Sequence, residues 1–80
     1  MEIIYTSKAE KQLTKIPQRE LKKIFLKIEK LSNEPDAGKM LKGEFEGLFS
    51  LRAWPYRIIY KMEKGQIIIF SVSHRQSVYK

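Results

Sequence analysis

The feature that most constrains this chain is a series of three strand-like runs near its C-terminus. Residues 48–54, 56–62 and 66–73 are rich in β-branched and aromatic side chains, which is typical of β-strands. A Trp-Pro pair separates the first two runs, and Glu-Lys-Gly at 63–65 separates the last two. Both are turn-forming sequences. The three runs therefore predict an antiparallel meander.

The first 33 residues predict a strand followed by two helices. Residues 2–5 form a short β-type run, and Ser7 with Glu10 has the spacing of a capping box. A helix is therefore expected to begin at Ser7. Pro17 interrupts that helix and opens a second one, which is expected to reach about Asn33.

The second predicted helix has an apolar face and a basic face. Its apolar side chains recur with helical periodicity and are Leu21, Ile24, Phe25, Ile28 and Leu31. The opposite face carries Arg19, Lys23, Lys27 and Lys30. A solvated helix back is one interpretation of these charges. A docking ridge for an acidic partner is the other, and Leu26, which lies among the lysines, favours it.

These elements predict one α+β domain covering residues 1–80, in the order β-α-α-β-β-β. We expect a small, mainly antiparallel four-stranded sheet with the two N-terminal helices on one face. The nearly continuous apolar run 66–73 is expected to be an interior strand. Residues 33–45 are expected to form a loop that brings Lys39 and Lys42 near the sheet.

Alternation along residues 48–62 assigns side chains to the two faces of the sheet. The core face is predicted to receive Phe49, Leu51, Ala53, Tyr56, Ile58, Tyr60 and Met62. The other face is predicted to receive Arg52, Arg57, Ile59 and Lys61. No acidic residue lies between Gly47 and Met62, so the polar positions of this face are largely cationic.

The composition restricts the classes of function. Sixteen Lys and Arg against nine Asp and Glu give a net charge of +7, which predicts a polyanionic partner. The absence of cysteine excludes disulfides and thiolate metal sites and predicts a reducing cytoplasm. A single histidine and a single aspartate argue against a Ser-His-Asp triad and against a metal cluster. We therefore expect no metal, no other cofactor and no membrane partner.

The cationic strands also carry aromatic residues, which together predict a single-stranded RNA site. Arginine binds phosphate through two parallel hydrogen bonds, and aromatic rings stack on bases. The relevant side chains are Arg52, Arg57, Arg75, Trp54, Tyr56 and Tyr79. RNA carries its own nucleophile, the 2′-hydroxyl, so cleavage needs only a base, an acid and cations around the phosphate.

The chain resembles the RelE/ParE superfamily of toxins from toxin–antitoxin pairs. Typical features of that family are a Leu-x-Gly segment, a strand ending in Arg, a Tyr-Arg-hydrophobic-hydrophobic-Tyr strand and a closing basic pair followed by Tyr. Here these are Leu41-Lys42-Gly43, Leu51-Arg52, Tyr56-Arg57-Ile58-Ile59-Tyr60, His74-Arg75 and Val78-Tyr79. The preceding helix pair also matches, so the resemblance covers essentially the whole chain.

For the RelE branch, the resemblance implies a microbial-ribonuclease-like fold and an mRNA endonuclease that acts in the ribosomal A site. It also implies a cognate antitoxin, which we expect to be small and acidic. By analogy Arg57 binds the scissile phosphate, Arg75 assists at the leaving oxygen, and Tyr79 stacks on or activates the RNA. His74 is the acid–base candidate because histidine is the side chain that most readily exchanges a proton near neutral pH. The expected RNA-binding residues are Arg52, Lys42, Lys39, Lys61 and Trp54.

Three departures from the family pattern limit this analogy. Ser50 stands where the best-known branch has lysine, so no base role transfers to it. The spacing of four residues between Arg75 and Tyr79 is short, and the Trp-Pro turn replaces one that usually contains glycine.

Several alternatives stay open at this level. The same fold serves ParE-type toxins, which inhibit DNA gyrase, and a basic binding module without catalysis would also fit the charge. Arg57 could pair with Glu44 or Glu46, and either glutamate could instead act as the base. Trp54 could pack at the hairpin tip, and His74 could be structural.

Overall fold

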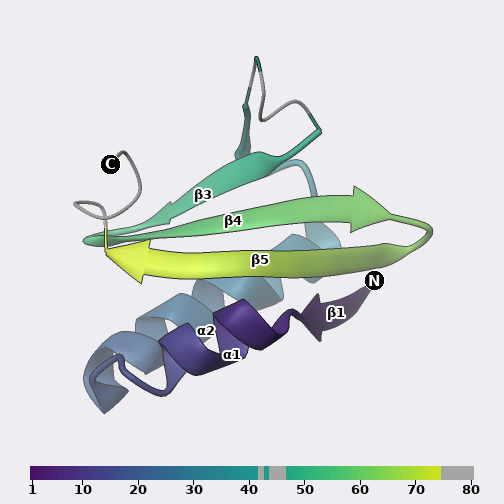
Figure 1. The fold of residues 1–80 in the computed structure, drawn as a ribbon. Helices are drawn as coiled ribbons and strands as arrows, with labels where there is room; N and C mark the ends of the chain where they lie inside the picture. The colour runs from purple at the N-terminus through teal and green to yellow at the C-terminus, as the bar shows by residue number, and fades with distance from the viewer. Residues whose placement is uncertain (42, 44–46, 75–80) are drawn as a thin grey trace.

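The computed structural model describes residues 1–41, 43 and 47–74, and it shows a five-stranded sheet with two helices on one face (Figure 1). The strand order across the sheet is β1-β5-β4-β3-β2. In chain order the elements are β1 (Glu2–Tyr5), α1 (Ser7–Leu13), α2 (Gln18–Asn33), β2 (Lys39–Met40), β3 (Phe49–Ala53), β4 (Tyr56–Glu63) and β5 (Gln66–His74). The predicted α+β class and the single helical layer are therefore confirmed.

The predicted number of strands was wrong by one. We expected a loop over residues 33–45, but β2 lies within it and pairs antiparallel with β3. Its register joins Lys39 to Ser50 and Met40 to Phe49. Two residues are too few to carry a periodic signal. This strand arises instead from the way the preceding loop is held, and Tyr60 takes part in that anchor as described below.

The interior position predicted for the last strand is confirmed. β5 pairs in parallel with β1 and antiparallel with β4. The β4–β5 hairpin turns at Lys64 and Gly65, whose φ angles are 47° and 77°. Positive φ at both central residues is the requirement of a type I′ turn, which matches the twist of the two strands.

The first helix begins at Ser7 as predicted, but Thr6 provides its cap. The Thr6 hydroxyl accepts a hydrogen bond from the Ala9 backbone N–H at 3.2 Å and donates one to the Phe70 carbonyl at 3.0 Å. The same hydroxyl therefore caps α1 and ties it to β5. The Gln12 side-chain carbonyl makes a second tie, because it accepts from the Val72 N–H at 2.7 Å.

The apolar stripe of α2 packs on the sheet, with one exception. Ile24, Ile28 and Leu31 are buried. Phe25 was predicted to belong to this stripe, but it is 42% exposed and meets Tyr5 edge to face, with the ring centroids 6.5 Å apart. A residue at the margin of a helical stripe lies over the edge of the core, and β1 is the edge strand there.

A β-bulge in β5 changes which of its residues face the helices. Tyr60 pairs with Ile69, whereas the neighbouring Ile59 pairs with Ser71. Phe70 is therefore the additional residue, and alternation restarts after it. The covered face then holds Ile67, Ile69 and Val72, which are all buried.

The core lies between this sheet face and the two helices. Besides the residues already named, it includes Ala9, Ile16, Ala53, Ile58 and Tyr60. In the part of the chain that the structure describes, no helix is long and apolar enough to span a membrane.

Candidate functional site

Two arginines lie side by side on the sheet face that the helices leave uncovered. In the β3–β4 register Arg52 is directly opposite Arg57. Their neighbours Ala53 and Ile58 are buried in the core, and successive side chains of a strand point to opposite faces. Arg52 and Arg57 therefore point away from the helices, as the sequence predicted. Arg52 is exposed and Arg57 is half-buried.

The charge distribution around these arginines favours an anion. Side chains directly opposite each other in a sheet have Cβ atoms about 4.5–5.5 Å apart, and like charges there destabilise the pair. Arg57 is flanked on its other side by Ser73 of β5. Within the described residues, this row across β3, β4 and β5 holds no Asp or Glu. An anion placed between the two guanidinium groups would remove their repulsion.

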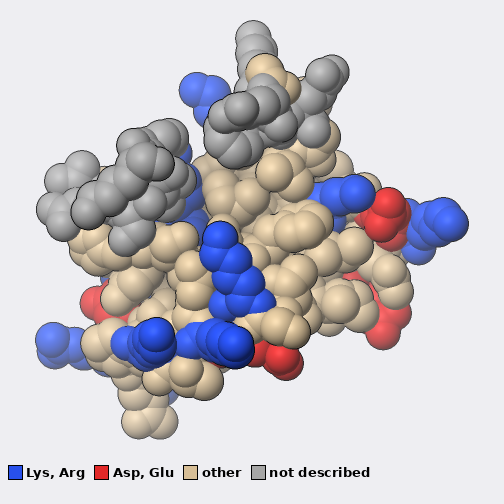
Figure 2. Space-filling model, in the orientation of Figure 1, with Lys and Arg blue, Asp and Glu red and all other residues tan. Residues whose placement is uncertain are grey.

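The acidic residues of the sheet lie at the opposite end of β4. Glu63 ends that strand and its carboxylate lies 3.2 Å from the Lys61 ammonium. Lys61 is on the uncovered face as predicted, but part of its charge is balanced by this pair. In Figure 2 the Asp and Glu side chains lie at the periphery of the view, whereas Lys and Arg also occupy its middle and a row over the helices. Along β4, the two arginines therefore lie at one end of the uncovered face and the Lys61–Glu63 pair lies at the other.

Lys39 reaches the same face through β2. Its register partner is Ser50, which lies two residues before Arg52 in β3 and therefore on the same face. The loop before β2 is anchored by Tyr60, whose hydroxyl donates to the Pro35 carbonyl at 2.8 Å and accepts from the Gly38 N–H at 2.9 Å. The sequence had assigned Tyr60 only to the core. Its polar end instead fixes the segment that leads to Lys39.

Gly38 is required by this anchor. A Cβ built on Gly38 would lie 2.6 Å from the Tyr60 hydroxyl oxygen, closer than real Cβ atoms approach. Burial raises the pKa of Tyr60 above its ordinary value of 10.0 and outweighs the lowering by the Gly38 N–H, while the Asp36 charge raises it further. The phenol therefore stays protonated at neutral pH and keeps its donor role. Sequence reasoning assigned residues 33–45 to a loop and missed this contact.

Trp54 lies in the β3–β4 turn, immediately after Arg52 and Ala53. Its side chain is 54% exposed, and a cis peptide bond joins it to Pro55. The indole is therefore at the tip of the hairpin that carries both arginines. This placement is compatible with base stacking and with the alternative of hairpin packing.

His74 does not share a face with Arg57. Its register partner is Tyr56, and the two rings meet edge to face with centroids 5.6 Å apart. Tyr56 in turn pairs with the buried Ala53, so alternation assigns His74 to the side that the helices cover. Ser73 takes the place beside Arg57 instead. The predicted acid–base role of His74 stays a prediction, and alternation assigns the imidazole and the Arg57 guanidinium to opposite faces of the sheet.

The other predicted site residues lie outside the described residues. These are Arg75, Tyr79 and Lys42, together with the alternative partners or bases Glu44 and Glu46. Among the residues that are described, no three His, Cys, Asp or Glu side chains come together in a way that could hold a metal ion.

Comparison with known proteins identifies the family. The model of the ParE toxin of type II toxin–antitoxin systems matches residues 3–79. This chain belongs to that toxin family. Toxin RelG of Mycobacterium tuberculosis is 35% identical to this chain, and the match covers 95% of this chain and 92% of RelG.

Two solved structures of toxin–antitoxin complexes have the same fold. The RelBE2 complex of Mycobacterium tuberculosis matches with a TM-score of 0.84 and 33% identity, covering 92% of this chain and 96% of that one. The RelB-RelE complex of Methanococcus jannaschii matches with a TM-score of 0.78 and 27% identity, covering 95% and 94%. The resemblance to the RelE/ParE superfamily is confirmed, and the protein is a toxin of a toxin–antitoxin system.

Proposed function

We propose that this toxin is an mRNA endoribonuclease that acts on the ribosome and thereby inhibits translation. The observation that carries the proposal is the pair Arg52–Arg57, which lies on the uncovered sheet face in a row without a described carboxylate. Two adjacent guanidinium groups match the oxygens of a phosphodiester. They bind it more tightly as negative charge develops on those oxygens in the transition state.

The reaction we propose is a transesterification within the RNA. The 2′-oxygen attacks the adjacent phosphorus while the bond from phosphorus to the 5′-oxygen breaks. One proton leaves the 2′-oxygen and one is delivered to the 5′-oxygen, so the products are a 2′,3′-cyclic phosphate and a 5′-hydroxyl. Arg57 would bind the non-bridging oxygens throughout, and Arg52 would hold the same phosphate or its neighbour.

The remaining roles are proposed from the family resemblance. Arg75 would assist at the leaving oxygen and Tyr79 would stack on or activate the RNA. Lys39, Lys42, Lys61 and Trp54 would bind the flanking nucleotides. His74 either exchanges a proton with the RNA as the acid–base residue, or holds the end of β5 through Tyr56.

We include the ribosome in this proposal because the described face supplies cations but no evident base. Ser50, Ser71 and Ser73 provide hydroxyls on or near the arginine row, and these are poor bases at neutral pH. Alignment of the 2′-hydroxyl by the ribosome would supply the missing contribution through proximity. Free mRNA should then be cut slowly or not at all.

We also propose a small acidic antitoxin as the partner of this toxin. Two relatives at 33% and 27% identity were crystallised as toxin–antitoxin complexes. A protein with a net charge of +7 is neutralised most simply by an acidic chain, and such a complex should weaken with increasing salt.

Primer extension on mRNA from cells that express the toxin tests this function. Discrete cleavage within translated codons, absent when translation initiation is blocked, is the expected result. A gyrase supercoiling assay run on the same protein tests the ParE-type alternative. Gyrase inhibition without any mRNA cleavage would replace our proposal by that alternative.

A further inference from the structure

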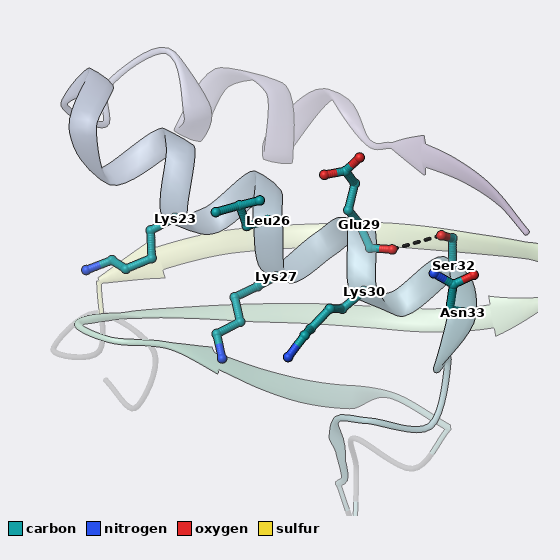
Figure 3. Close-up of a pocket in the computed structure, with 7 residues that line it drawn as sticks. All are labelled: Lys23, Leu26, Lys27, Glu29, Lys30, Ser32 and Asn33. Carbon is teal, nitrogen blue, oxygen red and sulfur yellow. Dashed lines mark hydrogen bonds between the residues drawn. The ribbon is translucent and has the colours of Figure 1, made fainter.

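The outer face of α2 holds a groove that is separate from the arginine pair. Side chains of the last three turns of the helix line an open hollow of about 600 Å³. The residues used below are Lys23, Leu26, Lys27 and Lys30, and Figure 3 shows the whole lining.

These four residues form one stripe along the helix. Their spacing of i, i+3, i+4 and i+7 places them on one side. The core residues Ile24, Ile28 and Leu31 lie on another side of the helix and are buried. The groove therefore lies on the outer surface of the helical layer, while Arg52 and Arg57 lie on the other face of the sheet. A ligand in the groove would leave the arginine pair accessible.

The charges of the groove are incompletely balanced. Lys23 is paired with Glu20 at 2.9 Å, but Lys27 and Lys30 form no ion pair with any residue in the described part of the chain. In Figure 3 both of these ammonium groups extend to the same side of α2, whereas the Glu29 carboxylate points away from them. Two neighbouring cations thus face a common space.

An apolar side chain lies at the margin of the same stripe. Leu26 is 64% exposed, and the aliphatic stems of the lysines extend the apolar surface around it. A leucine contributes little to binding a phosphate backbone, but it provides a contact for an apolar side chain of a peptide. The combination of two cations and one exposed leucine at helical spacing therefore favours a peptide over RNA as the occupant.

We propose that this groove binds an acidic peptide segment, with one apolar side chain on Leu26 and carboxylates on Lys27 and Lys30. This inference does not depend on RNA cleavage, because it uses a different surface. It implies that an acidic partner can hold this protein through α2 without covering the arginine pair.

Fluorescence anisotropy with two labelled synthetic peptides tests the proposal. One peptide is helical, made of Glu and Ala with a single central Leu, and the other has Ser in place of that Leu. The wild-type protein should bind the Leu peptide more tightly. Lys27→Glu with Lys30→Glu should weaken binding of the Leu peptide at least about tenfold, because two attractive pairs become repulsive.

Lys8→Glu with Lys11→Glu is the matched control. Both lysines are exposed on α1 with the same i, i+3 spacing, so the change in net charge is identical. Its effect on affinity should be much smaller than that of the groove variant. An equal loss in both variants would mean that only net charge matters and would overturn the proposal.

Leu26→Ser completes a double-mutant cycle with the two peptides. It should abolish the preference for the Leu peptide, and an undiminished preference would show that the apolar contact lies elsewhere.

An RNA duplex would be the occupant instead if it bound more tightly than the Leu peptide and if the same groove variant weakened its binding. Circular dichroism verifies that each variant is folded. Cleavage of mRNA in cells should be unchanged by all of them, so the two proposals can fail independently.

Discussion

Neighbouring residues of β4 lie on the two faces of the sheet, which have opposite environments. Ile58 and Tyr60 are fully buried against the helices, whereas Arg57 and Lys61 point to the uncovered face. The covered face is filled by apolar contacts and one anchored phenol, and the uncovered face concentrates positive charge. Because the two sets alternate along one strand, stability and function should respond to mutations at adjacent positions almost independently.

The largest effect on activity is expected for Arg57→Ala. Loss of a group that stabilises the transition-state phosphate costs about 2.7–4 kcal/mol, or a hundredfold to a thousandfold in rate. Ribosome-dependent mRNA cleavage and growth arrest should fall accordingly, while the thermal unfolding midpoint changes little. Arg57→Lys should recover part of the activity, because an ammonium retains the charge but not the planar fork.

Arg19→Ala is the matched control for that experiment. Arg19 is exposed on α2, so its loss changes the net charge equally without touching the sheet. It should retain full cleavage activity. If Arg57→Ala unfolds the protein, or stays folded and fully active, the separation of the two faces is wrong.

A smaller effect, confined to stability, is expected for Tyr60→Phe. The change leaves the Pro35 carbonyl and the Gly38 N–H without the phenol oxygen that both now contact. Such a loss should lower the free energy of unfolding by about 1–3 kcal/mol, measured by urea denaturation. Tyr56→Phe is the control, since Tyr56 lies on the same face of β4 and contacts His74 through its ring. Equal losses in both variants would contradict the anchoring role of the Tyr60 hydroxyl.

The smallest effect is expected for the free energy of unfolding at alkaline pH. Burial raises the pKa of Tyr60 in the folded protein, while in the unfolded chain the phenol titrates near its ordinary value of about 10. The protonated phenol is thus favoured by folding, and its contribution is fully present below pH of about 10 and is lost as the pH rises through the folded-state pKa.

Tyr60→Phe removes this contribution and provides the comparison. Its free energy of unfolding should decline less steeply than that of the wild type above a pH of about 10. Some decline should persist in the variant, because burial also raises the pKa of Tyr5. Parallel curves for the two proteins would mean that the Tyr60 phenol titrates alike in the folded and unfolded states.

The sequence by itself determined the helices, the four longer strands and the faces of β3 and β4. β3 and β4 alternate between apolar and polar residues at every position except Ile59, and a period of two allows only one register with the apolar side covered. The positions of Arg52, Arg57 and Lys61 followed from that alternation. The start of α2 followed from Pro17 and its length from its apolar stripe, whereas α1 ends at Leu13, before that proline.

The sides taken by the residues of β5 were decided only by the tertiary structure. Its run is apolar at nearly every position, so no period distinguishes its two faces. The bulge at Phe70 reverses the alternation, and the ties from Thr6 and Gln12 of the first helical segment hold the backbone there. As a result Ser73, rather than His74, lies beside Arg57. Likewise, β2 exists because the Tyr60 hydroxyl reaches Pro35 and Gly38 across more than twenty residues of chain, a contact that no local pattern can encode.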